Sequence, residues 1–109
     1  KGVFPLWLSP VQVKVIPVNP EFQGDYGKEI KDYLAENGVR VELDDRNEKL
    51  GYRMRESQTR KIPYTLIIGD KEVEDNSVSY RLHGEKETTT LSKEEFKKYI
   101  KNIIDTKTM

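Results

Sequence analysis

The apolar residues of this chain fall into short blocks that switch between the two-residue period of β-strands and the 3.6-residue period of α-helices. Three blocks are typical of strands. In residues 11–18, apolar and polar side chains alternate and then give way to a continuous apolar run, and Pro17 and Pro20 end this strand. In residues 39–43, apolar side chains alternate with charged ones. Residues 64–69 form a short apolar run, which predicts a central strand covered on both faces.

Two helices are predicted between these strands. Asp25 would cap the first, and Asn37 with Gly38 would end it in a left-handed turn. Its apolar face, spaced at i, i+4, i+7 and i+8, comprises Tyr26, Ile30, Tyr33 and Leu34. The second helix covers about residues 47–60, and its thin apolar face predicts a surface position with the basic side chains in water. Pro63 would end it.

The order strand, helix, strand, helix, strand predicts a parallel sheet with right-handed crossovers, because the connections are too long for hairpins. The pattern then changes. Residues 72–82 predict an antiparallel hairpin with a two-residue turn at 75–76. In that register Glu72 lies opposite Ser79 and diagonal to Arg81, so that both charged side chains could reach one ligand. The apolar face of the hairpin would comprise Val73, Val78, Tyr80 and Leu82.

The C-terminal part is predicted to end in a helix. Residues 84–90 are polar and are expected to form a mobile loop or a frayed edge. Ser92 and Glu95 then form a capping box, which marks the start of the most regular amphipathic helix in the chain. Its apolar face comprises Phe96, Tyr99, Ile100, Ile103 and Ile104.

The length of 109 residues fits one domain, which we place at residues 11–105 with an extended connecting segment at 1–10 and a tail at 106–109. The absence of cysteine excludes disulfides, thiolate zinc sites and cysteine nucleophiles. No apolar run is long enough to cross a membrane and no signal peptide is present, which favours a soluble, cytoplasmic protein without a membrane partner. The start at Lys1 hints at a domain of a longer protein, although processing would look the same.

The charge of the chain is balanced overall but not locally. Lysine plus arginine and aspartate plus glutamate both number 19, yet residues 46–61 hold six basic residues against two acidic ones. A neutral protein that gathers positive charge on one helix is suited to a polyanion, although a charged helix face is more often merely solvated. Nucleic acid is therefore one candidate partner.

Few residues suggest chemistry. Asp44 and Asp45 follow a predicted strand, where open α/β sheets often bind ligands, but Arg46 is a ready ion-pair partner and favours a structural role. His83 is the only histidine, so it can build neither a metal site nor a histidine-containing triad, and a surface position is expected. No phosphate loop, G-x-S-x-G or H-E-x-x-H motif occurs, so we predict no catalytic and no metal residue.

Several short motifs together resemble one known family. Nearly the whole chain is similar to the C-terminal anticodon-binding domain of bacterial threonyl-tRNA synthetases, which are class II aminoacyl-tRNA synthetases. The prolyl, histidyl and glycyl enzymes share the fold, but the R-N-E-K-x-G and G-D-K-E-V-E motifs favour the threonyl family. The matching residues are Phe4-Pro5, Trp7-Leu8, Pro10-Val11-Gln12-Val13, Asp45-Arg46-Asn47-Glu48-Lys49, Gly51, Arg55-Glu56, Ile62-Pro63-Tyr64 and Gly69-Asp70-Lys71-Glu72-Val73-Glu74.

This resemblance implies a three-layer α/β fold with a mixed five-stranded sheet, in which parallel strands are joined by an antiparallel hairpin, and three helices. It also implies that the domain binds the anticodon loop of threonine tRNA and reads its second and third bases, G and U. The implied base readers are Asn47, Glu72 and Arg81, and the implied backbone or supporting contacts are Arg46, Lys49, Arg53, Lys71 and His83. Glutamate can accept from N1 and N2 of guanine, and arginine can donate to O6, N7 or a uracil carbonyl.

The resemblance further implies that the domain is not itself catalytic and holds no cofactor. A longer threonine–tRNA ligase would use ATP, Mg²⁺ and Zn²⁺ in its catalytic part, which would be the second partner, and the isolated domain is expected to be monomeric. Two other functions stay open from sequence. One is a protein-interaction or assembly module with this fold that does not bind tRNA. The other is a standalone enzyme built on Asp44, Asp45 and Asp70.

Overall fold

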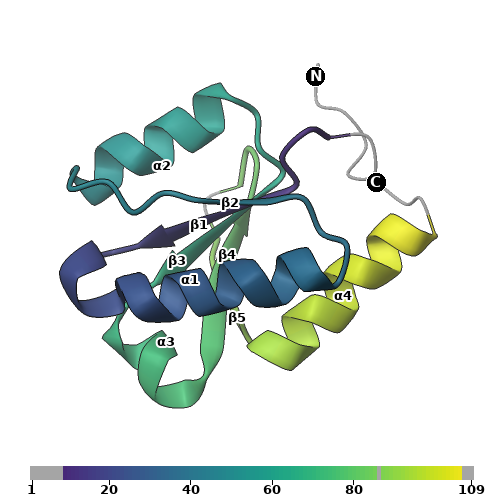
Figure 1. Ribbon diagram of the computed structural model, residues 1–109. Coiled ribbons are helices and arrows are strands. Elements are labelled where there is room, and N and C mark those ends of the chain that lie inside the picture. The colour runs from purple at the N-terminus through teal and green to yellow at the C-terminus, as the bar shows by residue number, and fades with distance from the viewer. Residues whose placement is uncertain (1–8, 86, 107–109) are drawn as a thin grey trace.

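Five strands form one mixed sheet, and helices cover both of its faces (Figure 1). The computed structural model describes residues 9–85 and 87–106. The elements are β1 (Val13–Pro17), α1 (Pro20–Glu36), β2 (Val41–Leu43), α2 (Leu50–Thr59), β3 (Tyr64–Ile68), α3 (Asp70–Asp75), β4 (Ser77–Leu82), β5 (Thr89–Ser92) and α4 (Lys93–Asp105). Helix α2 lies on one face of the sheet, and α1 and α4 lie on the other (Figure 1). The three-layer α/β fold is therefore confirmed, although the described residues form four helices and not three.

The strand order is β2-β1-β3-β4-β5. β1 pairs in parallel with β2 and β3, so that Val13 lies beside both Val41 and Tyr64. β4 pairs antiparallel with β3 and with β5. The predicted parallel unit is confirmed, and the carboxyl ends of β1, β2 and β3 meet at one edge of the sheet. This is the edge at which open α/β sheets bind ligands.

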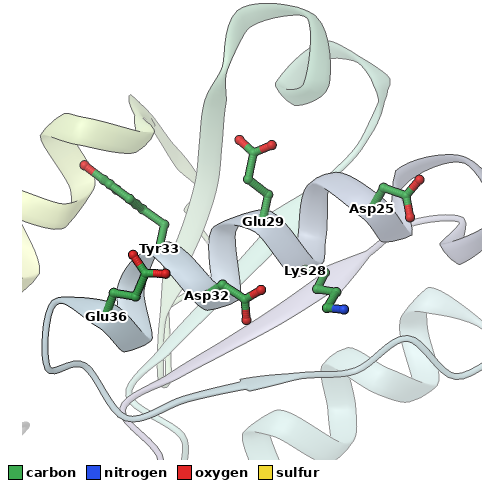
Figure 2. Close-up of a pocket in the computed structure, with 6 residues that line it drawn as sticks. All are labelled: Asp25, Lys28, Glu29, Asp32, Tyr33 and Glu36. Carbon is green, nitrogen blue, oxygen red and sulfur yellow. The ribbon is translucent and has the colours of Figure 1, made fainter.

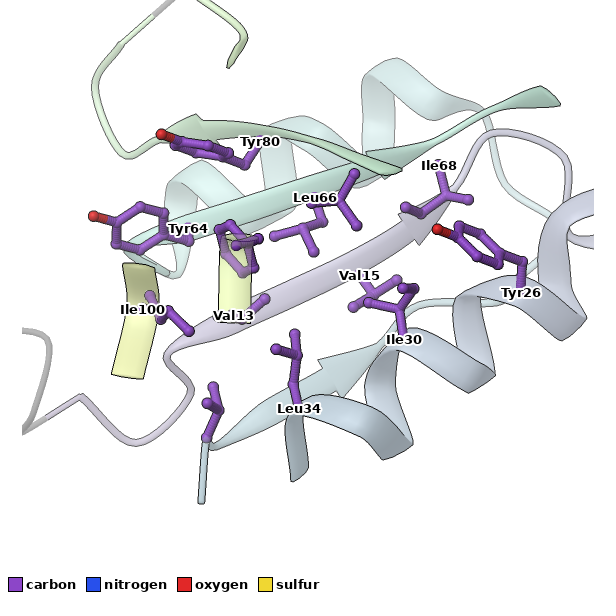
Figure 3. Packing of buried hydrophobic residues seen from close by; sticks show 13 residues of the cluster. Val13, Val15, Tyr26, Ile30, Leu34, Tyr64, Leu66, Ile68, Tyr80 and Ile100 are labelled. Atoms are coloured by element: carbon purple, nitrogen blue, oxygen red, sulfur yellow. The ribbon is translucent and has the colours of Figure 1, made fainter. Parts of the chain in front are cut away.

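The main hydrophobic core lies between the sheet and the layer formed by α1 and α4 (Figure 3). Val15 from β1 and Leu66 from β3 are fully buried there, together with Ile30 from α1 and Ile100 from α4. The apolar spacing of both helices follows the 3.6-residue period, so one face of each can be buried while the other stays in water. The core holds the strands in place, and with them the residues of the sheet and its loops that form the candidate site.

Helix α4 begins at the predicted capping box. Ser92 Oγ accepts a hydrogen bond from the backbone N–H of Glu95 at 3.1 Å, and Glu95 Oε1 accepts from the backbone N–H of Ser92 at 3.4 Å. These bonds satisfy N–H groups that have no partner inside the helix. Phe96 is the first buried residue of the predicted apolar face.

Helix α1 begins five residues before the predicted cap. Asn19, and not Asp25, is the N-cap, and its Oδ1 accepts from the backbone N–H of Glu21 at 3.1 Å. Pro20 occupies the first helical position, where its missing N–H costs nothing and its fixed φ suits the helix. Pro20, which the sequence predicts to end the preceding strand, therefore starts the helix. The predicted C-terminal stop is confirmed, since Gly38 has φ +84°.

Replacing Asn19 with alanine is expected to lower the free energy of unfolding by about 1 kcal/mol, because the N-terminal amides of α1 lose their side-chain partner. Urea unfolding followed by circular dichroism would measure the change. Asp25→Ala is the control, because Asp25 is exposed and lies beyond the first turn of the helix. An equal loss in both variants would show that Asn19 contributes no cap.

The predicted hairpin at residues 72–82 is wrong. Its first half is helix α3, which ends at Asn76 in the left-handed conformation with φ 53°, and Val73 is exposed and not part of an apolar face. The hairpin is instead β4–β5, so Thr89 and Thr90 belong to a strand and not to the predicted loop. A short helix forms because Glu72 bonds back to the backbone N–H of Gly69 at its start.

Two expectations concern segments beyond the described residues. The predicted connecting segment at 1–10 is described only from residue 9, and the predicted tail only at residue 106. Within the described residues, none of the helices is long and apolar enough to cross a membrane.

Candidate functional site

Side chains of β4 and β5 form a polar surface on the α2 side of the sheet. Thr65 of β3 pairs with Arg81 of β4, and the hydroxyl of Thr65 lies 2.7 Å from that of Ser57 in α2. Because paired residues share a face and side chains alternate, Arg81 and Ser79 point to this side. Ser79 Oγ lies 2.9 Å from Thr90 Oγ1 on β5. This polar face is therefore built from two antiparallel strands.

Glu72 of α3 reaches the polar face. Its Oε1 accepts from the backbone N–H of Gly69 at 2.7 Å, and its Oε2 accepts from Ser79 Oγ at 2.7 Å. The predicted closeness of Glu72 and Ser79 is therefore confirmed, although a helix and not a hairpin brings it about. Each carboxylate oxygen has a second lone pair, so two further donors can be accepted side by side. The neighbouring Lys71 is exposed.

Arg81 stands two residues from Ser79 on the same face, about 7 Å along the strand. Its Nη2 donates to Thr88 Oγ1 at 3.3 Å, and its Nε is enclosed with no partner among the described residues. His83 is half-buried and not a surface residue, and its Nδ1 is likewise enclosed without a partner among them. Glu72 and Arg81 thus supply acceptors and donors on one surface.

Asn47 lies at the edge where the parallel strands end. It is exposed in the loop between β2 and α2, and with Asn19, Pro20 and Glu21 it lines a cavity of about 250 Å³. Helix α2 begins at Leu50 with Lys49 as its N-cap, so Asn47 precedes the helix and does not start it. Lys49 is exposed beside this loop.

The position of Arg53 corrects the prediction of a helix with its basic side chains in water. Its side chain has an exposed fraction of 0%, so it has no surface with which to contact RNA. Period alone cannot reveal this, because an arginine on a polar helix is usually solvated.

Two other cations of this segment are ion-paired. Arg46 donates from Nε and Nη2 to both oxygens of Asp44 at 2.8 Å and also pairs with Glu56, and Arg60 pairs with Glu42 at 2.6 Å. The predicted Asp44–Arg46 pair is confirmed. The local positive excess is therefore partly neutralised. Within residues 46–61, all of which the structure describes, the exposed cations without an ion pair are Lys49, Arg55 and Lys61.

A buried charge network lies beneath the loop. Lys14 is buried in β1, and its Nζ lies 2.7 Å from Glu42 Oε1. The hydrogen bond from Arg60, opposed by burial and assisted by Lys14, lowers the pKa of Glu42 to about 2. For Asp44, burial raises the pKa, but the bonds from Arg46 outweigh burial and leave the pKa below its usual value. Both carboxylates therefore stay ionised at neutral pH.

Acid is expected to destabilise the protein through this network. Because the folded-state pKa of Glu42 lies below its ordinary value of 4.5, its contribution is complete above that pH and is lost as pH falls toward about 2. A Glu42→Gln variant should therefore lose less stability than wild type over this range, as measured by urea unfolding at several pH values. Glu74→Gln, which removes an exposed carboxylate, is the control. Parallel pH curves for wild type and Glu42→Gln would contradict the expectation.

The three aspartates considered as the active site of a standalone enzyme do not form a cluster. Asp44 is held by Arg46, Asp45 is exposed, and Asp70 accepts from Gln23 Nε2 at 2.6 Å. Among the residues that the structure describes, no group of three or more histidines and carboxylates could hold a metal ion. A depression of about 460 Å³ on the outer face of α1 is rich in carboxylates, which disfavours a polyanion there (Figure 2). Its lining residues are Asp25, Lys28, Glu29, Asp32, Tyr33 and Glu36.

The chain matches a known protein family over most of its length. Residues 12–103 match the family model described as the anticodon binding domain. The chain belongs to this anticodon-binding domain family. The match runs from before β1 into α4 and so includes the polar face, the Asn47 cavity and helix α2.

Curated relatives and solved structures agree with this membership. The chain is 54% identical over 107 residues to the threonine–tRNA ligase of Oceanobacillus iheyensis and 54% identical over 105 residues to that of Staphylococcus carnosus. These alignments cover 98% and 96% of the chain but only 17% and 16% of the two relatives. This anticodon-binding domain therefore spans about one sixth of their length.

The fold agrees as well. The RNA binding domain of threonyl-tRNA synthetase from Cryptosporidium parvum Iowa II superposes with a TM-score of 0.88 at 26% identity, covering 93% of this chain and 25% of that one. Prolyl-tRNA synthetase from Cryptosporidium parvum superposes with a TM-score of 0.84 at 25% identity, covering 95% and 22%. These comparisons do not favour the assembly module considered from sequence.

Sequence reasoning missed part of the polar face of the anticodon-binding domain. Thr90 joins Ser79 there as part of β5, whereas the sequence predicts a mobile loop or a frayed edge over residues 84–90. The signal was present, since the run Thr88 to Thr90 is β-branched and leads into Leu91, a pattern that favours a strand.

Proposed function

We propose that this chain is the anticodon-binding domain of a threonine–tRNA ligase and that it binds the anticodon loop of threonine tRNA. The observation that carries the proposal is the 54% identity to a threonine–tRNA ligase across 98% of the chain. By holding the anticodon, the domain would place the acceptor end of the tRNA in a catalytic part that lies outside this chain. Specificity, and not bond chemistry, would be its contribution.

The polar face suits an unstacked base. Glu72 has two free acceptor positions that match the N1 and N2 donors of guanine, and Arg81 can donate to O6, N7 or a uracil carbonyl. Asn47, with a donor and an acceptor, would read a further base from the cavity beside it. Exposed Lys49 and Lys71 would contact phosphates.

Three of the RNA contacts that the resemblance implies have other roles in this proposal. Arg46 is ion-paired with Asp44 and Glu56, so we assign it to holding the Asn47 loop in place and not to contacting RNA directly. His83 would border the Arg81 end of the face, where its enclosed Nδ1 limits it to contacts through the rest of the ring. Arg53 makes no direct contact in the proposal, because it is buried.

The longer protein would carry out ATP-dependent attachment of threonine to tRNA, with ATP, Mg²⁺ and Zn²⁺ bound in its catalytic part. We propose that this part is the second partner of the domain, that the isolated domain is a monomer, and that the protein acts in the cytoplasm. Sedimentation of the isolated chain would test the monomer directly. Concentration-dependent dimers would contradict it.

The test of the main proposal is binding of a threonine anticodon stem-loop to the 109-residue chain. The central G of the anticodon is replaced with A in a matched stem-loop, and both are titrated at several salt concentrations. We expect tighter binding of the G loop, with a preference that persists as salt weakens both complexes, because phosphate contacts are salt-dependent and base contacts are specific. Equal affinity for both loops at every salt concentration would refute the proposal.

A further inference from the structure

Arg53 is the largest fully buried side chain among the described residues, and the proposed function leaves it without a role. Its guanidinium donates four hydrogen bonds, all to backbone carbonyl oxygens. Nη1 donates to Pro17 at 2.6 Å and to Asp44 at 3.3 Å, Nη2 donates to Val18 at 2.9 Å, and Nε donates to Glu48 at 3.0 Å. One side chain thus joins helix α2 to two other segments of the chain, the end of β1 with its connection to α1 and the loop from β2 to α2.

No ion pair with another described residue balances this buried charge. Within the described residues, no carboxylate lies within ion-pair distance of Arg53, and the Asp44 carboxylate is taken by Arg46. Burial lowers the pKa of Arg53, yet an arginine stays protonated in proteins. Burying a charge is costly unless hydrogen bonds compensate, so the four carbonyl contacts must offset most of that cost.

Two of the four carbonyls belong to residues that are next in sequence to the lining of the Asn47 cavity. Val18 leads directly into Asn19, which lines one wall, and Glu48 directly follows Asn47, which lines the other. Asp44 marks the start of the loop that carries Asn47. Both walls are therefore attached to residues that a single guanidinium holds. A planar fork can donate in several directions at once, whereas an ammonium group is a compact point charge.

We propose that Arg53 is a positioning residue that fixes the two walls of this cavity and so orients Asn47 toward an RNA base. Only the last step of this inference, the orientation of Asn47 toward an RNA base, rests on the function proposed above. A loop that is already ordered loses less conformational freedom when it binds, so the effect of Arg53 on RNA would come through Asn47 and not through a phosphate.

The first test needs no RNA. Arg53→Lys keeps the charge but loses the fork, and amide hydrogen exchange is followed at Val18, Asp44 and Glu48, whose N–H groups donate to Ile68, Val15 and Arg46 at 2.8, 2.8 and 2.9 Å. We expect exchange at these three amides to accelerate roughly tenfold or more, the scale of lost hydrogen bonds to a charged group, while amides of α4 are unchanged. Unchanged exchange at all three would overturn the proposal.

Arg40→Lys is the matched control. Arg40 also donates from Nε to a backbone carbonyl, that of Ser9 at 2.8 Å, but it lies just before β2, at the opposite end of that strand from Asp44. It should leave the three amides unchanged. Equal acceleration in both variants would show a general softening and would also overturn the proposal.

If Arg53→Lys does not fold, the wild-type chain still provides a test. Native-state exchange at low guanidinium reports the local openings that precede unfolding. Because one side chain holds both walls, we expect Val18, Asp44 and Glu48 to become exposed in one shared step. Independent openings of the two walls would overturn the proposal.

The second test uses the anticodon stem-loops. Arg53→Lys should bind the cognate loop more weakly and discriminate less, by about tenfold, against a substituted base at the position that Asn47→Ala identifies. The salt dependence of binding should not change even in Arg53→Gln, whereas a lost phosphate contact would reduce its logarithmic slope by about 0.7 to 0.9. A reduced slope with intact discrimination would overturn the proposal. If wild type does not discriminate but the exchange result holds, the proposed function fails while the positioning role stands.

Discussion

Replacing Glu72 with glutamine is expected to remove most of the preference for a guanine-containing anticodon loop over the same loop with adenine. The amide can still accept from Gly69 and contact Ser79, so helix α3 and the polar face stay in place. One acceptor facing the base becomes a donor, however, and it then opposes the N1 or N2 donor of guanine. The loss should be about 1 to 3 kcal/mol of binding free energy, the usual range for one bidentate base contact.

Fluorescence anisotropy with the two stem-loops would measure this change. Glu74→Gln is the matched control, because it removes the same charge from the same short helix at an exposed position. It should shift the affinity for both loops equally and only slightly. Equal weakening of the guanine and adenine loops by Glu72→Gln would contradict a base-reading role and would point to a general electrostatic effect.

The parallel half of the fold could be predicted because its signals are local and repeat. β1, β2 and β3 each show an apolar period or run, and the helices between them bury one face. In such segments the apolar pattern repeats at every turn or every second residue, so one misread residue does not change the predicted helix or strand. The placement of Glu72 beside Ser79 is also predicted, but from a hairpin register that does not form; it holds because Glu72 lies in α3, which leads directly into β4.

The remaining errors concern short segments in which one hydrogen bond decides the structure. Residues 72–74 alternate polar with apolar side chains as a strand does, and the bond from Glu72 to the start of α3 makes them part of a helix. Pro20 can end a strand or start a helix, and the side chain of Asn19 decides the outcome. Arg53 gives no sequence signal of burial at all, because its partners are backbone carbonyls from distant segments. Long-range backbone contacts of this kind leave no pattern in the chain.

The aromatic cluster that joins α4 to the sheet should give the largest loss of stability in the protein. Phe96 has an exposed fraction of 1%, and its ring centroid lies 5.2 Å from that of Tyr80 and 6.1 Å from that of Tyr64. Phe96→Ala should lower the free energy of unfolding by about 3 to 5 kcal/mol, because apolar contacts are lost and a cavity remains. Urea unfolding monitored by tyrosine fluorescence and circular dichroism would measure it.

Tyr99→Phe separates packing from hydrogen bonding in this cluster. It keeps the ring beside Phe96 and removes only the hydroxyl that lies 2.9 Å from the hydroxyl of Tyr64, so we expect a loss of about 1 kcal/mol. Because β4 carries Arg81 and is packed through Tyr80 against α4, the Phe96→Ala variant should also bind the stem-loop more weakly wherever it is partly unfolded. Loss of RNA binding at urea concentrations where circular dichroism is unchanged would show instead that the polar face detaches before the rest of the domain.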